Sequence, residues 1–525
     1  MKVLLVTGKL AEETVKTHAT QQKNFETEVA VLNYPVAAFL NSETIIAGLK
    51  NCNLKNIDMI ITPGLSYGNT QIITDNLGVP TFKGPKYAAD IPVILEEYDK
   101  IQLSTTIPAC VLLQKVLSER ALKEIEKAEQ NHKELSKQPD SSMVIKNLVI
   151  NKNLPMRVMA EIVDAALMDN EEIQCLAKNF VTQGAHIIDV GMLAGKSDPE
   201  NAKRIVKAVK AVVDVPVSID TLDPEEIQAA VCAGVDMILS LDAGNIDKLA
   251  TFATDIPVVI IPTNQREGYF PKKASERVPL IEELILKAQK FGFKKILADL
   301  ILEPTNVLES FIAFKNFSVK HPDIPLFVGV ANVTELFDAD SVGINALLSM
   351  LSAEVNANIM LATEKSIKAK GTIREEVTAA KMMYLAKKRA SVPKDLGIDL
   401  LVLKDKRSRE EPYDTALEKE SNLTFATDET VSSYLDSVGM FKINLDRKNN
   451  DIVASMFTDV SMDKPLNIIK GKTAKAVYTK IVQLGLVTRL DHAAYLGSEL
   501  EKADIALKTG KEYIQDTCLF EKNTC

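Results

Sequence analysis

Short apolar runs alternate with amphipathic segments through the middle of the chain. Segments with helical spacing, such as residues 171–182, 199–212 and 278–291, separate runs whose length and β-branched content are typical of buried parallel strands. Eight such runs occur, at residues 157–163, 186–190, 215–219, 237–240, 257–261, 295–299, 325–329 and 358–361. Eight strand–helix repeats in roughly 230 residues predict a (β/α)8 TIM barrel, and the regular count favours a closed barrel over an open doubly wound sheet.

The segments on either side of this repeat have different patterns. In residues 1–115, short apolar runs alternate with helical segments, which predicts an open α/β domain of the Rossmann or flavodoxin type. Residues 116–152 are charged and helical and then reach Pro139, so we expect a helix followed by a linker. The barrel is expected over residues 153–392.

Residues 393–525 break the barrel rhythm. Two alternating runs, at 440–445 and 452–457, flank Lys448-Asn449-Asn450-Asp451 and predict a β-hairpin. A long charged helix is expected at 492–516. The predicted fold is therefore an α/β protein with a central TIM barrel, an N-terminal open α/β domain and a C-terminal α+β domain.

Composition and charge exclude several classes of function. The 525 residues carry 62 basic and 71 acidic side chains, a net charge of −9 that argues against a general nucleic-acid-binding protein. No apolar run of about 18 residues is present, so no membrane span is expected. The six cysteines form no CxxC and no zinc-type cluster with histidine, which is typical of reduced thiols in a cytoplasmic protein.

Polar residues recur where the predicted barrel strands end. In a TIM barrel, the carboxyl ends of the strands surround the site, so polar residues there are expected to converge on one rim. These residues are Glu161, Asp189, Asp220, Asp299 and Asn332. For Asp189, a helix cap or a loop hydrogen bond is an equally good interpretation.

Several carboxylates in an enclosed mouth repel one another and lose hydration, so each needs a partner. One kind of partner is a divalent cation such as Mg²⁺, which prefers oxygen ligands. The other is a ligand with an amidine-like edge, which donates two parallel N–H bonds to a carboxylate. A pterin ring presents such an edge through N3–H and its 2-amino group. Both kinds of partner remain open at this point.

Three stretches resemble a known enzyme family. Residues 183–191 (QGAHIIDVG), 216–221 (PVSIDT) and 233–238 (AGVDMI) are similar to the second, third and fourth strands of dihydropteroate synthases. Residues 327–333 (FVGVANV), continued by Asn345, look more like methyltetrahydrofolate methyltransferase domains. Both groups share a pterin-binding barrel. The domain order and the tail His492-Ala493-Ala494-Tyr495-Leu496-Gly497 resemble archaeal dihydropteroate-synthase-related proteins, which are associated with tetrahydromethanopterin.

The resemblance implies a role for each rim residue. Asp220 and Asp299 would be the catalytic pair that holds the pterin ring, Asp189 would support the pterin site, and Asn332 would touch the ring near N5. Glu161 stands where dihydropteroate synthases have an Asn linked to metal and diphosphate. The implied reaction joins a hydroxymethyl-dihydropterin diphosphate to an arylamine, which in this context is a ribofuranosyl-aminobenzene phosphate. We expect Mg²⁺ to assist the reaction, and a homodimer is a compatible assembly.

The sequence also departs from the synthase pattern. Residues 237–240 (MILS) replace the strand that carries a pterin-contacting Asn, the S-x-R-K motif is absent, and residues 361–363 (LAT) replace the diphosphate-binding R-x-H. Cations that could bind diphosphate instead follow the fifth and eighth strands, although residues of this kind are more often solvated surface charges; they are Arg266, Lys272, Lys273, Lys365 and Lys368. Two other functions therefore stay open: methyl transfer between a pterin and a corrinoid protein, and pterin binding without catalysis.

Overall fold

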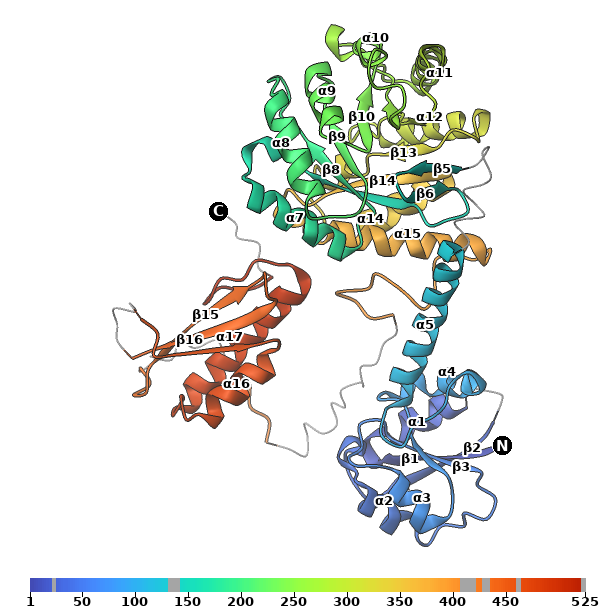
Figure 1. Ribbon diagram of the computed structural model, residues 1–525. Coiled ribbons are helices and arrows are strands. Elements are labelled where there is room, and N and C mark those ends of the chain that lie inside the picture. Colours follow the sequence, from blue (N-terminus) through green and yellow to red (C-terminus); the bar gives the residue numbers. More distant parts are fainter. Residues whose placement is uncertain (21–24, 131–141, 407–421, 427–434, 459–463, 521–525) are drawn as a thin grey trace. The chain divides into compact units, whose positions relative to one another are not determined.

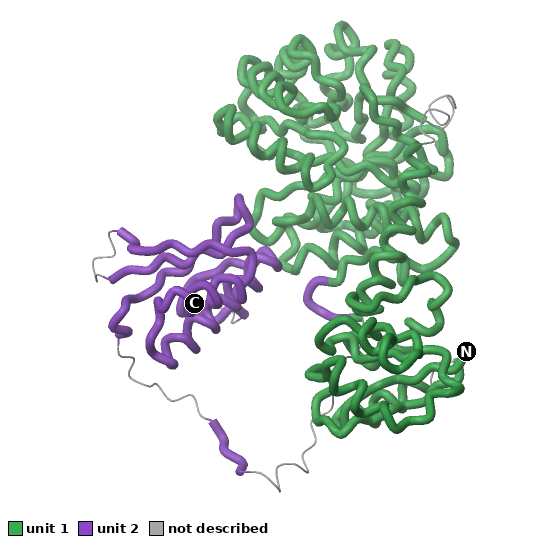
Figure 2. Tube along the Cα trace, turned by 60° about the horizontal axis from the view of Figure 1, so that its bottom comes forward, with its two compact units in different colours: residues 1–401, 406–410 green, residues 402–405, 411–525 purple. Residues whose placement is uncertain are grey.

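The computed structural model describes residues 1–20, 25–130, 142–406, 422–426, 435–458 and 464–520. The chain divides into two compact units, residues 1–401 with 406–410 and residues 402–405 with 411–525 (Figure 2). The first unit contains the barrel and the N-terminal sheet, and the second contains a smaller antiparallel sheet.

Eight parallel strands close into a barrel, as predicted (Figure 1). They are β7 (Arg157–Ile162), β8 (Ile187–Gly191), β9 (Val217–Asp220), β10 (Met237–Leu241), β11 (Val258–Ile260), β12 (Ile296–Ala298), β13 (Leu326–Val328) and β14 (Ala357–Thr363). The last strand pairs with the first, from Ile359 opposite Arg157 to Thr363 opposite Glu161. The carboxyl ends of all eight strands therefore surround one rim.

Helices cover the outside of the barrel. They are α7 (Asn170–Gln183), α8 (Pro199–Lys210), α9 (Pro224–Cys232), α10 (Ile246–Leu249), α11 (Ala274–Phe291), α12 (Val307–Lys320), α13 (Ala331–Thr334), α14 (Ser341–Glu354) and α15 (Thr372–Lys388). Asp198 and Asp223 each precede a Pro at the first helical position and accept backbone N–H bonds at the starts of α8 and α9. These local caps determine where the chain turns back from the rim.

Side chains alternate between the inside of the barrel and the helix layer. On β7, Val158 and Ala160 pack in the core against the helices, whereas Met159 belongs to a separate cluster that fills the barrel. Arg157 and Glu161 share the side of Met159 because side chains repeat every two residues along a strand. One strand thus carries a cation at its start, an apolar residue in its middle and an acid near its end.

A short hairpin closes the opposite end of the barrel. Strands β5 (Ser142–Ile145) and β6 (Leu148–Asn151) pair antiparallel, and Ile145 and Ile150 join the interior cluster. The prediction of a linker is therefore wrong for these residues. It failed because each strand has only four residues, too few for a periodic pattern.

The helix before this hairpin belongs partly to the barrel. Helix α5 (Ala109–Gln130) runs past the predicted boundary at residue 115, and its Ala121 and Ile125 are in the barrel core. Arg157 donates to Val149 O in the hairpin at 3.0 Å and to both Glu129 oxygens at 2.6 and 2.9 Å. This buried guanidinium links the helix, the hairpin and β7.

The N-terminal residues form an open parallel sheet in the order β2-β1-β3-β4, which confirms the predicted α/β domain. Its strands are β1 (Lys2–Gly8), β2 (Glu26–Leu32), β3 (Met59–Thr62) and β4 (Thr81–Lys83), and its helices are α1 (Glu12–Ala19), α2 (Ser42–Leu49), α3 (Gln71–Leu77) and α4 (Ile91–Glu96).

The second unit has the predicted α+β character. The hairpin of β15 (Met440–Asp446) and β16 (Asp451–Phe457) is confirmed, and β17 (Asn467–Gly471) extends it to three strands. Helices α16 (Ala474–Gln483) and α17 (Leu490–Thr509) pack against this sheet. Among the helices that the structure describes, none combines the length and apolar content needed to cross a bilayer.

Candidate active site at the carboxyl rim of the barrel

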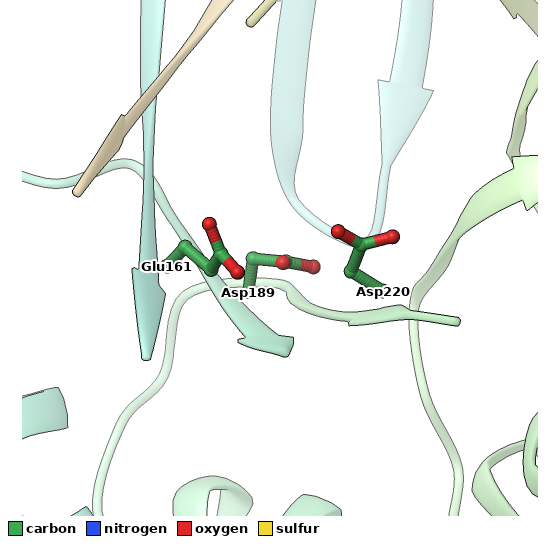
Figure 3. A group of neighbouring side chains, drawn as sticks. All are labelled: Glu161, Asp189 and Asp220. Carbon is green, nitrogen blue, oxygen red and sulfur yellow. The ribbon is translucent and has the colours of Figure 1, made fainter. Parts of the chain in front are cut away.

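Three carboxylates from neighbouring strands meet at the rim. Glu161 lies near the end of β7, Asp189 lies opposite it on β8, and Asp220 ends β9. One oxygen from each lies within 4.8 Å of the others (Figure 3). The structure therefore brings together three of the five residues expected at the rim, and we call them the acid triad.

Asp189 is the most deeply buried member of the acid triad, with no exposed surface. Its Oδ1 accepts a hydrogen bond from Ser218 Oγ, and its Oδ2 has no partner among the described residues. A buried carboxylate oxygen without a donor is costly unless it carries a proton or contacts a cation. The open alternative for Asp189, a helix cap or loop bond, does not match this geometry.

The triad holds protons more tightly than ordinary carboxyls. Burial and the neighbouring charges of Asp220 and Asp164 raise the pKa of Glu161 to about 8. Burial raises the pKa of Asp220 to about 6, and burial with the charges of Asp220 and Glu161 raises the pKa of Asp189 well above its usual range. The three groups cannot all be ionised at neutral pH without a cation among them.

A glycine provides the space for this arrangement. A Cβ atom at Gly191 would lie 2.6 Å from Glu161 Oε1. Any larger residue at this position would therefore displace the Glu161 carboxylate from the triad.

Asp299 stands at the same rim, immediately after β12. It is only 8% exposed, and burial raises its pKa to about 7, with the charge of Asp220 adding to the increase. Its Oδ1 accepts the backbone N–H of Ile301 at 2.8 Å. Ile301 has a φ of 64°, a left-handed conformation that is strained for a β-branched residue and that is tolerated when surrounding contacts enforce it.

Arg277 on α11 provides those contacts. Its fully buried guanidinium donates to Leu300 O at 3.2 Å and Ile301 O at 2.8 Å, and it also pairs with Glu303 Oε2 at 2.7 Å. Sequence reasoning did not select Arg277. The available signal was an arginine at a position whose neighbours, Val278 and Ile281, are both apolar.

Asn332 lies on the next loop but is exposed, at the start of α13. Its Nδ2 donates to Leu302 O at 3.2 Å, so it touches the same loop that carries Asp299. Asn345, in contrast, is fully buried in α14 and bonds to Thr334, Thr372 and Glu375. Its observed contacts are those of helix packing.

The candidate diphosphate-binding cations divide into two groups. Lys272 pairs with Glu303 at 2.5 Å, Lys365 with Asp164 at 2.5 Å and Lys368 with Asp338 at 2.6 Å. Arg266 and Lys273 are exposed on the loop after β11 and form no ion pair with a described carboxylate. These two cations are the ones available to an anion without breaking an existing pair.

Comparison with known proteins adds to this geometry. A family model described as "Pterin binding enzyme" matches residues 162–390, which span most of the barrel. An uncharacterised protein of Methanocaldococcus jannaschii is 40% identical over 99% of both chains. Dihydropteroate synthase of Streptococcus pyogenes is 33% identical over 102 residues, 17% of this chain and 38% of that enzyme. The chain belongs to the pterin-binding family related to dihydropteroate synthase.

Among solved structures, the chain is similar to dihydropteroate synthase of Xanthomonas albilineans in complex with 7,8-dihydropteroate. It is 18% identical with a TM-score of 0.38, and the match covers 48% of this chain and 99% of that chain. Outside the barrel, residues 435–516 match a family described as PterinBD-DUF4346, and residues 1–86 match a family of unknown function (DUF6513).

Proposed function

We propose that this protein condenses 6-hydroxymethyl-dihydropterin diphosphate with an arylamine and releases diphosphate. The observation that carries the proposal is the pair of desolvated carboxyls, Asp220 and Asp299, at the rim of a pterin-binding barrel. The arylamine we expect is a ribofuranosyl-aminobenzene phosphate, as the resemblance to the archaeal proteins implies.

Asp220 and Asp299 would hold the pterin ring. Each carboxylate can accept the parallel N–H bonds of an amidine edge or a ring N–H. Their pKa values of about 6 and about 7 lie near neutrality, so ionisation at the moment of binding costs little and is driven by the incoming donors. Arg277 would act as a positioning residue because it holds the turn that orients Asp299.

The acid triad fits a divalent cation such as Mg²⁺. Carboxylate oxygens are the ligands that this ion prefers, and the unpartnered Asp189 Oδ2 needs a positive partner. Glu161, Asp189 and Asp220 would hold the ion, which when bound would neutralise charge on the departing diphosphate. Because Asp220 would serve both ion and pterin, the two ligands should influence each other's affinity.

The proposed reaction replaces diphosphate by the arylamine at the methylene carbon of the pterin. In the reaction, the C–O bond to diphosphate breaks, the arylamine nitrogen forms a bond to the same methylene carbon, and the amine loses one proton. The electron-rich dihydropterin stabilises the developing positive charge. Arg266 and Lys273 would attract the diphosphate in place of the missing R-x-H cations.

Methyl transfer between a pterin and a corrinoid protein is a second candidate. The position of Asn332 beside the Asp299 loop favours it, as does the absence of the S-x-R-K motif. A pterin-binding subunit without catalysis would bind the ring and release no product.

The decisive assay incubates the full chain with the pterin diphosphate, the arylamine and Mg²⁺ and measures diphosphate. We expect release only when both organic substrates are present. Methyl transfer to an added corrinoid protein would support the second candidate, and pterin binding without either reaction would support a binding subunit.

A matched set of variants tests the site itself. Asp220→Asn and Asp299→Asn should each weaken pterin binding by at least about 100-fold while the circular dichroism spectrum is unchanged, because an amide cannot accept both N–H bonds. Asp247→Asn is the control, since the Asp247 side chain is 65% exposed and pairs with Lys287 at the surface. Wild-type affinity in the two rim variants, measured by calorimetry, would refute the assignment.

A further inference from the structure

A cavity lies at the end of the barrel opposite the acid triad. Its volume is about 170 Å³, and it is lined by the approach to β13, by the approach to β14 and by Lys152, which directly follows β6. A smaller cavity of about 30 Å³ shares Lys152 and Asn356 with it and adds Lys387 from α15. The two hollows therefore form one neighbourhood around Lys152 and Asn356.

Two ammonium groups line these hollows, Lys152 at both of them and Lys387 at the smaller one. Neither Lys152 nor Lys387 forms an ion pair with any carboxylate in the part of the chain that the structure describes. Lys387 Nζ instead donates to the uncharged Asn356 Oδ1 at 3.0 Å. Burial and the nearby positive charge of Lys152 lower the pKa of Lys387. Two like charges that affect each other across a hollow are stabilised by an anion between them.

Two amide groups add uncharged donors. Asn356 Oδ1 accepts from Lys387, and Asn358 Oδ1 accepts from the backbone N–H of Leu326 at 3.0 Å. These bonds orient each amide. Each NH₂ group remains able to donate to a ligand, since neither Nδ2 has a hydrogen bond to a described residue. The two adjoining hollows therefore combine two cations with two amide NH₂ groups that are free to donate to a ligand.

His321 and Asp323 also line the larger cavity, and neither of them pairs with the two lysines. His321 is already bonded to Glu282 through Nε2 at 2.9 Å, and its ring lies tilted against Phe317 with the ring centroids 4.8 Å apart. Asp323 is exposed and is the one carboxylate among the lining residues. A single exposed acid can accept a hydrogen bond from a hydroxyl group of a ligand whose charged end faces the lysines.

We propose that the larger cavity, at the side where it adjoins the smaller hollow, binds a phosphate dianion, free or as a small phosphomonoester, through Lys152, the amides of Asn356 and Asn358, and Lys387 of the smaller hollow. Two positive charges match a dianion, and four separate donors suit a tetrahedral group whose oxygens point in different directions. The volume exceeds about 150 Å³, the size of a cavity that holds benzene, so a phosphoryl group with a few further atoms fits. The proposal does not rest on the proposed function, because the site is at the other end of the barrel.

Titration calorimetry of the full chain tests this, with inorganic phosphate and glycerol 3-phosphate as probes at constant ionic strength. We expect both to bind, and Lys152→Gln with Lys387→Gln to weaken the affinity by at least about tenfold. Lys207→Gln, which removes an exposed charge from α8, is the matched control and should retain wild-type affinity. If glycerol 3-phosphate binds more tightly than phosphate, the ester is the better model of the ligand.

Two results would overturn the proposal. One is that neither probe binds in the millimolar range, and the other is that the double variant binds the probes with wild-type affinity. The single variant Lys152→Gln guards against misfolding, because Lys152 is exposed and its side chain forms no ion pair with the described residues. It should reduce phosphate affinity about threefold or more without lowering the melting temperature of the phosphate-free protein. Pterin affinity should be unchanged in every variant of this set.

Discussion

The two ends of the barrel are built from the same eight strands but are stabilised in different ways. At the carboxyl rim, Glu161, Asp189 and Asp220 face one another, and the strained turn at Ile301 holds Asp299. At the other end, Ile145 and Ile150 of the hairpin close the barrel with aliphatic packing. The rim therefore depends on polar groups that need specific partners, whereas the hairpin packs Ile145 and Ile150 against the barrel interior by apolar burial, which is non-directional.

This difference between the two ends indicates which residues contribute to ligand binding and which contribute to the stability of the fold. A buried polar group without a hydrogen-bond partner is stabilised when a ligand supplies one, and Asp189 Oδ2 is such a group among the described residues. The packed side chains of Ile145 and Ile150 need no ligand. Variants at the two ends should therefore move ligand affinity and the free energy of unfolding in different proportions.

The largest effect is expected at Arg277. Arg277→Met should lower the free energy of unfolding by about 3–5 kcal/mol, because it leaves the carbonyl oxygens of Leu300 and Ile301 without their donor and removes one of the two cations that pair with Glu303. Pterin affinity should fall as well, because the turn at Ile301 loses its support. Urea denaturation and calorimetry measure the two quantities. Arg374→Met, at an exposed position on α15, is the control, and a loss below about 1 kcal/mol at Arg277 would contradict the network.

The closed end should show stability loss alone. Ile150→Ala should cost about 2–4 kcal/mol of unfolding free energy, since it leaves a cavity under the barrel core. Pterin affinity should stay at the wild-type value. Ile367→Ala removes an exposed side chain and should be nearly neutral. A parallel fall in pterin affinity for Ile150→Ala would mean that the two ends are coupled.

The pH dependence should reveal the acid triad. Glu161, Asp220 and Asp299 have native pKa values of about 8, 6 and 7, all above their ordinary values, so the native state binds more protons than the unfolded state between about pH 5 and 8. In EDTA, the free energy of unfolding should therefore fall as pH rises through this window. The expected fall is a few kcal/mol, because each unit of pKa shift corresponds to about 1.4 kcal/mol. Glu161→Gln should flatten the slope, and Mg²⁺ at pH 8 should restore stability. A slope of the opposite sign would contradict the raised pKa values.

The smallest effect is expected at Lys365. Its pair with Asp164 is more than half exposed on the lysine side, so Lys365→Gln should change the unfolding free energy by less than about 0.5 kcal/mol. If the free cations bind diphosphate, Arg266→Gln should raise the KM for the pterin diphosphate more than Lys365→Gln does. Steady-state kinetics with both variants compares them, and the reverse order would identify Lys365 as the diphosphate ligand.

Much of this architecture could be predicted from patterns along the chain. All eight barrel strands occur where the apolar runs predict them, because a parallel strand buried on both faces must be apolar throughout. The rim acids could be predicted for the same reason, since Asp189 and Asp220 interrupt such runs near strand ends. Arg277 could not, because an arginine in an amphipathic helix usually indicates a solvated face.

The sequence by itself determined the repeat, the strands and the acidic character of the rim, because these follow from local periodicity and from the chemistry of single residues. Only the tertiary structure decided that Glu161 belongs with Asp189 and Asp220, that Asp189 Oδ2 lacks a partner among the described residues, and that Lys152 and Lys387 line one cavity. The physical reason is that repulsion, desolvation and hydrogen bonding depend on distances of a few ångströms between residues far apart in the chain. Barrel closure and the short hairpin set those distances, and no pattern along the sequence contains them.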